Sequence, residues 1–89
     1  MEEILTYNKE DGWVGYIEKD NDIFMSAHTY NGKYSFGMLK AIVVLANKLN
    51  TFYTIFPTKK LEEFYAKSYN IEVVDVDSKL YKVKGRKWE

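Results

Sequence analysis

The chain has 89 residues, enough for one small domain (residues 1–89) with a single hydrophobic core. Its 13 basic residues balance 13 acidic residues, which argues against general nucleic-acid binding. It has no cysteine, and it has 1 histidine without clustered carboxylates, so we expect neither disulfides nor a metal site.

The N-terminal third alternates short apolar runs with polar turns. Residues 3–8, 13–18 and 23–28 are rich in side chains that favour strands. The Asp-Gly pair in the first turn is typical of a tight hairpin. We therefore predict an antiparallel meander of three strands, with a bulge or a close backbone approach at Gly15.

The longest apolar stretch lies in the middle of the chain, at residues 36–49. Apolar side chains recur there at helical spacing. The expected apolar face contains Phe36, Leu39, Val43 and Ala46, widened by Ile42, Val44 and Leu45. We therefore predict a mostly buried helix that ends at Asn47 or Asn50. No segment is apolar over the length that a bilayer requires, so we expect a cytoplasmic protein without membrane contact.

The second half begins with a strand and a helix. Residues 52–56 are rich in β-forming side chains and predict a central strand, which Pro57 ends. Thr58 is a suitable N-cap for a helix over residues 59–68. The apolar face of this helix is expected to contain Leu61, Phe64, Tyr65 and Ser68.

Two more strands are expected at residues 71–76 and 80–83. Residues 82–87 are locally basic and are expected to form a solvated tail, with a phosphate-binding patch as the alternative, and Trp88 is expected outside the core. The predicted order is β-β-β-α-β-α-β-β. The fold class is therefore α+β, with a mixed, mostly antiparallel sheet and two helices.

A polar turn leads directly into the long helix. A helix N-terminus presents unpaired N–H donors and the positive end of a dipole, so the segment from Gly32 to Gly37 is a candidate anion site. Lys33 could pair with that anion. The alternative is a plain turn that caps a core helix and leaves Lys33 in solvent.

Three segments of the chain match motifs of a known enzyme family. The first is Trp-Val-Gly-Tyr-Ile-Glu, which begins at Trp13. The second is the turn and helix start at residues 30–39, and the third is Phe64-Tyr65-Ala66-Lys67. Together they resemble the third strand, the pyrophosphate loop and the Phe-Tyr-x-Lys segment of the GNAT superfamily, the acyl-CoA-dependent N-acyltransferases.

The resemblance implies a scaffold that lacks the family's first strand and the two helices that follow it. It also implies acetyl-CoA as the cofactor of an active member. The cofactor-binding residues would be Gly32, Lys33, Tyr34, Ser35, Phe36 and Gly37. Tyr34 and Phe36 stand at the two positions where the family has small residues that let the backbone approach the pyrophosphate.

The resemblance also implies two candidate catalytic residues. Tyr65 would donate a proton to the departing CoA thiolate, and His28, at the end of the third strand, would accept a proton from the amine. The alternatives are that Tyr65 is a residue at the edge of the core and that His28 is an ordinary surface residue.

Two functions are compatible with the sequence. One is a small binding or interaction protein on a degenerate GNAT-like scaffold without efficient catalysis. The other is an active acetyl-CoA-dependent N-acetyltransferase that acts on an amine of a protein or a small molecule. One expected partner is a second copy in a homodimer, because the sheet is short and the chain is rich in aromatic residues. The other is a host protein, because very short members of this kind occur among phage proteins that modify or block host factors.

Overall fold

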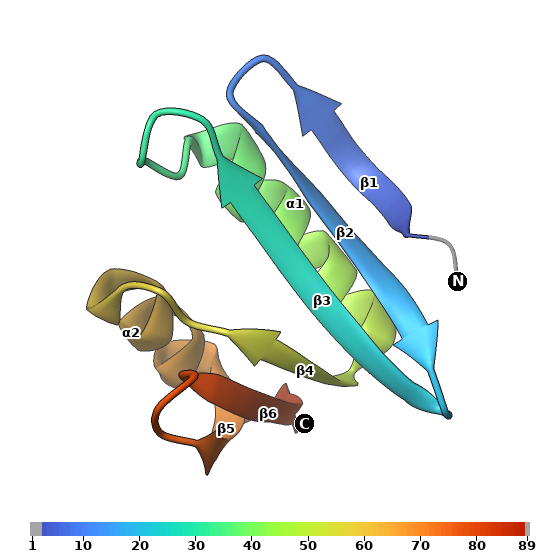
Figure 1. Cartoon of the computed structure of the whole chain (residues 1–89). Coiled ribbons are helices and arrows are strands. Elements are labelled where there is room, and N and C mark those ends of the chain that lie inside the picture. Colours follow the sequence, from blue (N-terminus) through green and yellow to red (C-terminus); the bar gives the residue numbers. More distant parts are fainter. Residues whose placement is uncertain (1–2, 89) are drawn as a thin grey trace.

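The computed structural model describes residues 3–88 and has the predicted order of elements (Figure 1). The six strands and two helices are β1 (Ile4–Lys9), β2 (Gly12–Lys19), β3 (Asp22–Thr29), α1 (Phe36–Leu49), β4 (Thr51–Ile55), α2 (Lys59–Ser68), β5 (Tyr69–Asp75) and β6 (Leu80–Arg86). The α+β fold class is confirmed. No helix within residues 3–88 is both long enough and apolar enough to cross a bilayer.

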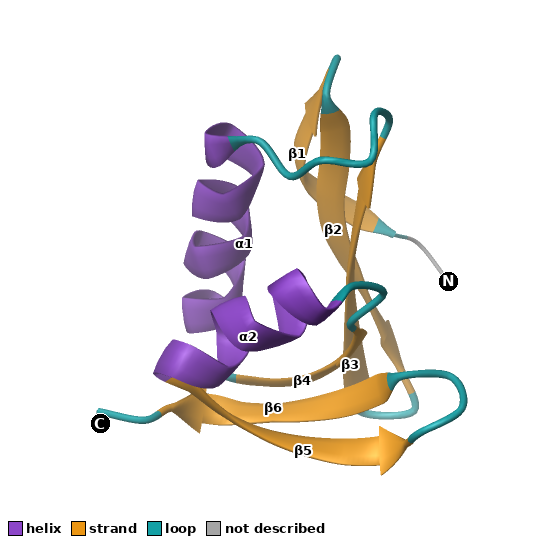
Figure 2. Ribbon diagram, turned by 90° about the vertical axis from the view of Figure 1, so that its left-hand side faces the viewer, coloured by secondary structure: helices purple, strands orange, loops and turns teal. Residues whose placement is uncertain are grey.

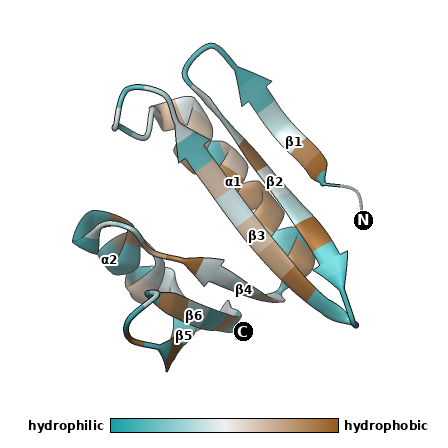
Figure 3. Cartoon of the chain, in the orientation of Figure 1, coloured by the Kyte–Doolittle hydropathy of each residue, from teal (hydrophilic) through white to brown (hydrophobic). Residues whose placement is uncertain are grey.

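All six strands form one mixed sheet in the order β1-β2-β3-β4-β6-β5. The first three strands are the predicted meander, and β4 lies next to β3 and parallel to it. Both helices lie on the same side of the curved sheet (Figure 2). Among residues 3–88, no helix covers the opposite face, which is turned toward the viewer in Figure 3.

Local sequence explains the turns and the helix ends. Asp20 and Asn21 both have positive φ values, as the tight turn between β2 and β3 requires. Ser35 and Thr58 cap the two helices, each accepting a hydrogen bond from a backbone N–H three residues later. Asn50 ends α1 with a positive φ of 67°, and it is one of the two residues at which the helix was predicted to end.

The core lies between the helices and the sheet. The buried stripe of α1 contains Met38, Ile42, Leu45 and Ala46. These residues pack with residues of strands β2 to β6 and of α2. The partners of this stripe are Val14, Met25, Phe52, Phe56, Leu61, Tyr65, Tyr69 and Val83. Leu61 and Tyr65 are the buried residues of α2, so the face predicted for that helix is confirmed in its centre.

The face predicted for α1 was wrong at two positions. Phe36 is 85% exposed and Val44 is 60% exposed. Two residues along a helix correspond to a rotation of about 200°, so Phe36 points away from the side that Met38 buries, and Val44 points away from that of Ile42. The actual stripe begins two residues later than predicted.

The end of the chain also differs from the prediction. The strand predicted at residues 80–83 is present, but it continues to Arg86 as β6, which pairs with both β4 and β5. Most of the basic segment at residues 82–87 that was expected as a solvated tail therefore belongs to this strand. Val83 within it is fully buried, and Lys84 forms an ion pair with Glu72 of β5 at 2.9 Å. Alternation of small or apolar residues with basic ones therefore marks a strand here. Trp88, beyond β6, is 80% exposed, as expected near the chain end.

Candidate functional site

The turn before α1 is held by hydrogen bonds within itself. The Thr29 hydroxyl donates to the Lys33 carbonyl at 2.6 Å, and the Lys33 N–H donates to the Asn31 side-chain oxygen at 3.0 Å. The Asn31 N–H donates in turn to the Thr29 hydroxyl at 3.4 Å. Two backbone donors that an anion could have used are therefore already paired.

A carboxylate of the chain itself lies at the N-terminus of α1. Asp11, from the turn between β1 and β2, accepts a hydrogen bond from the Ser35 hydroxyl, and Ser35 Oγ accepts the Met38 N–H at 3.2 Å. The Tyr7 hydroxyl lies 3.0 Å from both carboxylate oxygens of Asp11. The helix dipole favours negative charge at this position, so Asp11 acts as an internal anion.

These contacts change the acidity of the carboxyl group. The hydrogen bond from Ser35, with a further one from Tyr7, lowers the pKa of Asp11 below its usual value of 3.8. Desolvation acts in the opposite direction but is outweighed. Asp11 is therefore ionised at neutral pH, and the start of α1 carries a fixed negative charge.

Because the pKa of Asp11 is lower in the folded state, its contribution to stability is fully present above pH 3.8 and is lost as the pH falls through the folded-state pKa. We expect Asp11→Asn to lower the melting temperature by several degrees at about pH 7, and by much less at about pH 2. Thermal unfolding of both proteins at the two pH values measures this difference. Equal melting temperatures at neutral pH would contradict the role assigned to Asp11.

The other residues of the predicted cofactor loop differ in their surroundings. Gly32 and Lys33 are exposed, and Phe36 projects into solvent. Tyr34 packs partly against the core, and this burial raises the pKa of its hydroxyl. A Cβ atom at Gly37 would lie 3.0 Å from the Tyr7 hydroxyl, so Tyr7 already occupies the space beside that glycine.

Tyr65 is a core residue in this structure. Only 1% of its surface is exposed, and its hydroxyl donates to Met25 Sδ of β3 at 3.8 Å. Burial raises the pKa of this hydroxyl far above its ordinary value, so Tyr65 keeps its proton. Its ring centroid lies within 6.2 Å of the rings of Phe52, Phe56, Phe64 and Tyr69.

His28 lies on the other face of the sheet. Successive strand residues point to opposite faces, and Met25, three positions earlier, points into the core toward Tyr65. The His28 ring instead contacts Trp13 at 6.0 Å and Tyr30 at 5.5 Å between centroids. The structure therefore does not bring the two predicted catalytic residues together on one side of the sheet.

The junction between β3 and β4 opens into a cavity. Only Phe24 and Tyr53 pair directly across it, with stacked rings 5.3 Å apart. The Thr54 hydroxyl donates to the Met25 carbonyl at 2.9 Å and closes the core side. The cavity has a volume of about 340 Å³, and its lining includes Ser26, Ala27, Ile55, Pro57 and Leu80.

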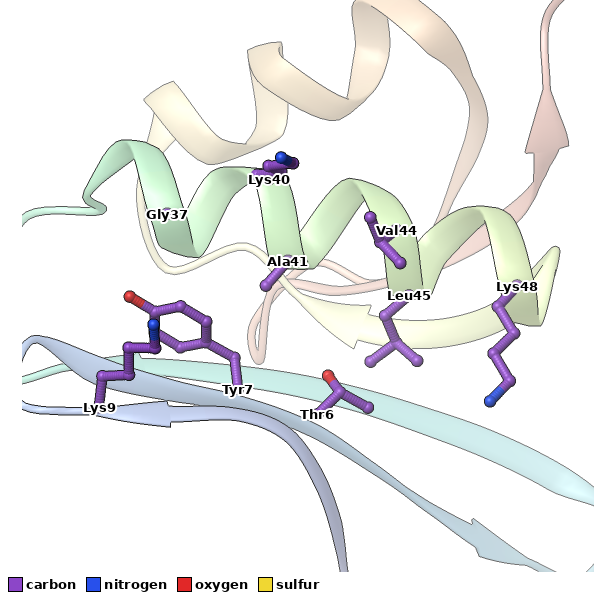
Figure 4. Close-up of a pocket in the computed structure, with 9 residues that line it drawn as sticks. All are labelled: Thr6, Tyr7, Lys9, Gly37, Lys40, Ala41, Val44, Leu45 and Lys48. Carbon is purple, nitrogen blue, oxygen red and sulfur yellow. The ribbon is translucent and has the colours of Figure 1, made fainter.

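A second hollow was not predicted from the sequence. It lies between α1 and β1, has a volume of about 450 Å³ and is here named the lysine groove (Figure 4). Its lining residues are Thr6, Tyr7, Lys9, Gly37, Lys40, Ala41, Val44, Leu45 and Lys48. A signal was present in the sequence: Lys40, Val44 and Lys48 recur every four residues and mark a second stripe on α1.

Among the residues that the structure describes, no group of three or more potential metal-ligating side chains lies together. Comparison of the chain with protein-family models, with curated proteins and with solved structures gave no match in any of the three.

Proposed function

We propose that this protein is a small binding protein on a degenerate GNAT-like scaffold, without efficient acyl transfer. The observation that carries the proposal is the Asp11 carboxylate at the N-terminus of α1. A CoA pyrophosphate would need the same helix end and the same positive dipole. Two anions compete there, and the carboxylate is held by Ser35 and Tyr7 before any ligand arrives.

Two further features support a binding role. The sheet face opposite the helices is uncovered, and the lysine groove combines an apolar floor with three basic side chains. Large exposed apolar groups on a small protein often mark contact surfaces. The proposed partner is a host protein or a second copy of this chain, and a cytoplasmic location and a phage origin belong to the same proposal.

An acetyl-CoA-dependent N-acetyltransferase is the second candidate, and the cavity between β3 and β4 is the observation that favours it. The amine nitrogen would attack the thioester carbonyl carbon and form the amide bond while the carbon–sulfur bond breaks. Tyr65 would give its proton to the thiolate only if the core opened, because its hydroxyl is buried, donates to Met25 Sδ and does not line the cavity. Water or His28 would take the amine proton, and positioning would supply most of the rate enhancement.

Titration with acetyl-CoA separates the two candidates. For the binding protein we expect no heat and no shift of the melting temperature up to about 1 mM ligand, which corresponds to less than about 4 kcal/mol of binding free energy. Isothermal titration calorimetry and thermal unfolding provide the two measurements. The mass in solution, measured by light scattering alone and with candidate partners, tests association.

A response at micromolar acetyl-CoA would overturn the proposal and favour the enzyme. That response should then disappear in Gly37→Trp, which adds a bulky side chain in the first turn of α1, and in Lys33→Glu, which reverses the charge of the basic residue in the turn. Lys67→Glu on α2 is the matched control, because it makes the same charge change in the last turn of the other helix.

A further inference from the structure

The lysine groove has a defined pattern of charge and apolar surface. Lys9 and Lys40 lie toward one end, Lys48 lies at the other end, and Val44 and Leu45 lie between them (Figure 4). None of its lining residues is acidic. Such a groove is complementary to a ligand with an apolar centre and a negative charge at each end.

The groove runs along an unpaired strand. β1 is the last strand of the sheet, and its outer side has no strand partner among residues 3–88. The pairing of β1 with β2 shifts register between Leu5 and Tyr7, and both Thr6 and Tyr7 point toward the helix in Figure 4. An extended peptide is the one occupant that pairs with these main-chain groups while filling the groove with alternate side chains.

The spacing of the lysines matches an extended chain. Lys40 and Lys48 are two helical turns apart, a rise of about 12 Å along α1. In a strand, side chains four residues apart lie on the same face at a separation of about 13 Å. An acidic residue at each end and an apolar residue midway would place the apolar side chain over Val44. This pattern reads the same in both directions, so it serves a parallel or an antiparallel strand.

This chain does not contain the pattern that its own groove requires. Glu18 and Asp22 are its only acidic residues four apart, and the residue midway between them is Asp20. Glu18, Asp20 and Asp22 moreover belong to the ends of β2 and β3 and the turn between them. A second copy is therefore a poor occupant.

We propose that the lysine groove binds an extended acidic segment of another protein, which adds to the sheet as a strand beside β1. The segment has the pattern acidic-x-apolar-x-acidic. This proposal rests on the binding function proposed above and names the partner's chemistry. Its main-chain hydrogen bonds to β1 supply affinity, and the pairing of its carboxylates with Lys40 and Lys48 supplies selectivity.

The test uses a capped peptide of sequence Thr-Asp-Thr-Val-Thr-Asp-Thr, with Thr-Thr-Val-Asp-Asp-Thr-Thr as a control of the same composition. We expect the first peptide to bind with a Kd below about 1 mM and to shift backbone amide resonances of β1 and α1. The control peptide should bind at least about tenfold more weakly, because its adjacent aspartates point to opposite sides of a strand. Nuclear magnetic resonance titration measures both affinities.

Charge reversal tests the groove itself. Lys40→Glu/Lys48→Glu should weaken binding about tenfold, because two attractive contacts become repulsive. Lys60→Glu/Lys67→Glu on α2 is the matched control with the same net charge, and it should leave the affinity within about twofold of the parent. All four lysines are exposed, so both variants should fold.

Backbone methylation distinguishes strand addition from loose charge attraction. One peptide is N-methylated on the aspartates and the valine, and a second is N-methylated on the alternate threonines between them. Only one set of amides faces β1 in an added strand, so one methylated peptide should lose binding and the other should keep it.

Equal binding of the two methylated peptides, equal binding of the control peptide, or no binding at about 1 mM would overturn the proposal. Self-association that Lys40→Glu/Lys48→Glu abolishes would also overturn it, in favour of a second copy. If the protein binds neither the peptide nor acetyl-CoA, the peptide proposal is wrong and the proposed binding function is unaffected. A micromolar response to acetyl-CoA would remove that function instead.

Discussion

Tyr65→Ala is expected to remove about 3–5 kcal/mol from the free energy of unfolding, the usual cost of deleting a large buried aromatic side chain. A domain of this size has roughly 5–15 kcal/mol in total, so the variant should lose a large part of its stability. The reason is the position of the ring, which packs against both strands and helix residues in the centre of the core. Urea denaturation followed by circular dichroism measures the change.

Tyr65→Phe is the matched control for this prediction. It keeps the ring and removes only the hydroxyl, which donates to a thioether sulfur at 3.8 Å, a weak acceptor. We expect a change of less than about 1 kcal/mol. A large loss in Tyr65→Phe, or a small one in Tyr65→Ala, would show that the ring does not have the structural role described above. If Tyr65→Phe kept its stability but lost a measurable acyl-transfer activity, the result would instead support the N-acetyltransferase.

Gly12→Ala is expected to be nearly as damaging, although it adds only one carbon atom. A Cβ atom at Gly12 would lie 2.2 Å from the His28 carbonyl oxygen and 2.8 Å from Met38 Cε, and φ is +155°. The backbone of β2 or β3 must move to relieve the first contact, and the cost is on the order of 3 kcal/mol. Denaturation of the variant and the parent protein gives the difference directly.

Gly37→Ala is the control for that substitution. Gly37 lies in the first turn of α1, where alanine favours the helix over glycine by roughly 0.5–1 kcal/mol. The new methyl group would contact the Tyr7 hydroxyl at 3.0 Å, which requires a small shift of a side chain. Its effect should therefore be slight in either direction. A loss in Gly37→Ala that equals the loss in Gly12→Ala would contradict the close approach of β2 and β3.

Local patterns predicted the elements and their order because each element carries its own signal. The Asp-Gly turn, the cap Thr58 and the break at Pro57 act within a few residues of the bonds they make. β4 lies beside β3 and parallel to it, and the two strands are connected through α1, as is usual for parallel strands. Periodicity wrongly placed Phe36 and Val44 on the buried face of α1, because this helix has apolar side chains nearly all around and sequence alone does not show which of them meets the sheet.

The candidate site depended on contacts that sequence spacing does not reveal. Asp11 and Ser35 are 24 residues apart, and their hydrogen bond exists only because the β1–β2 turn and the start of α1 meet in the folded chain. The resemblance assigns catalytic roles to both His28 and Tyr65. Alternation along β3 points Met25 toward Tyr65 and points His28 to the opposite face of the sheet. The lysine groove could not be predicted without knowing that β1 is an edge strand, and that depends on the order of the strands in the sheet.

The sparse pairing of β3 with β4 has a consequence for the chain's main-chain amides. A six-stranded sheet ordinarily leaves only its two outermost strands with unpartnered backbone groups. Here Phe24 and Tyr53 form the one direct pair between β3 and β4, and the Thr54 hydroxyl donates to the main-chain carbonyl of Met25 at the same junction. The two parts of the sheet, β1–β3 and β4–β6, are therefore joined chiefly by side-chain packing in the core beneath them. We expect local opening of the structure to occur first at the β3–β4 junction.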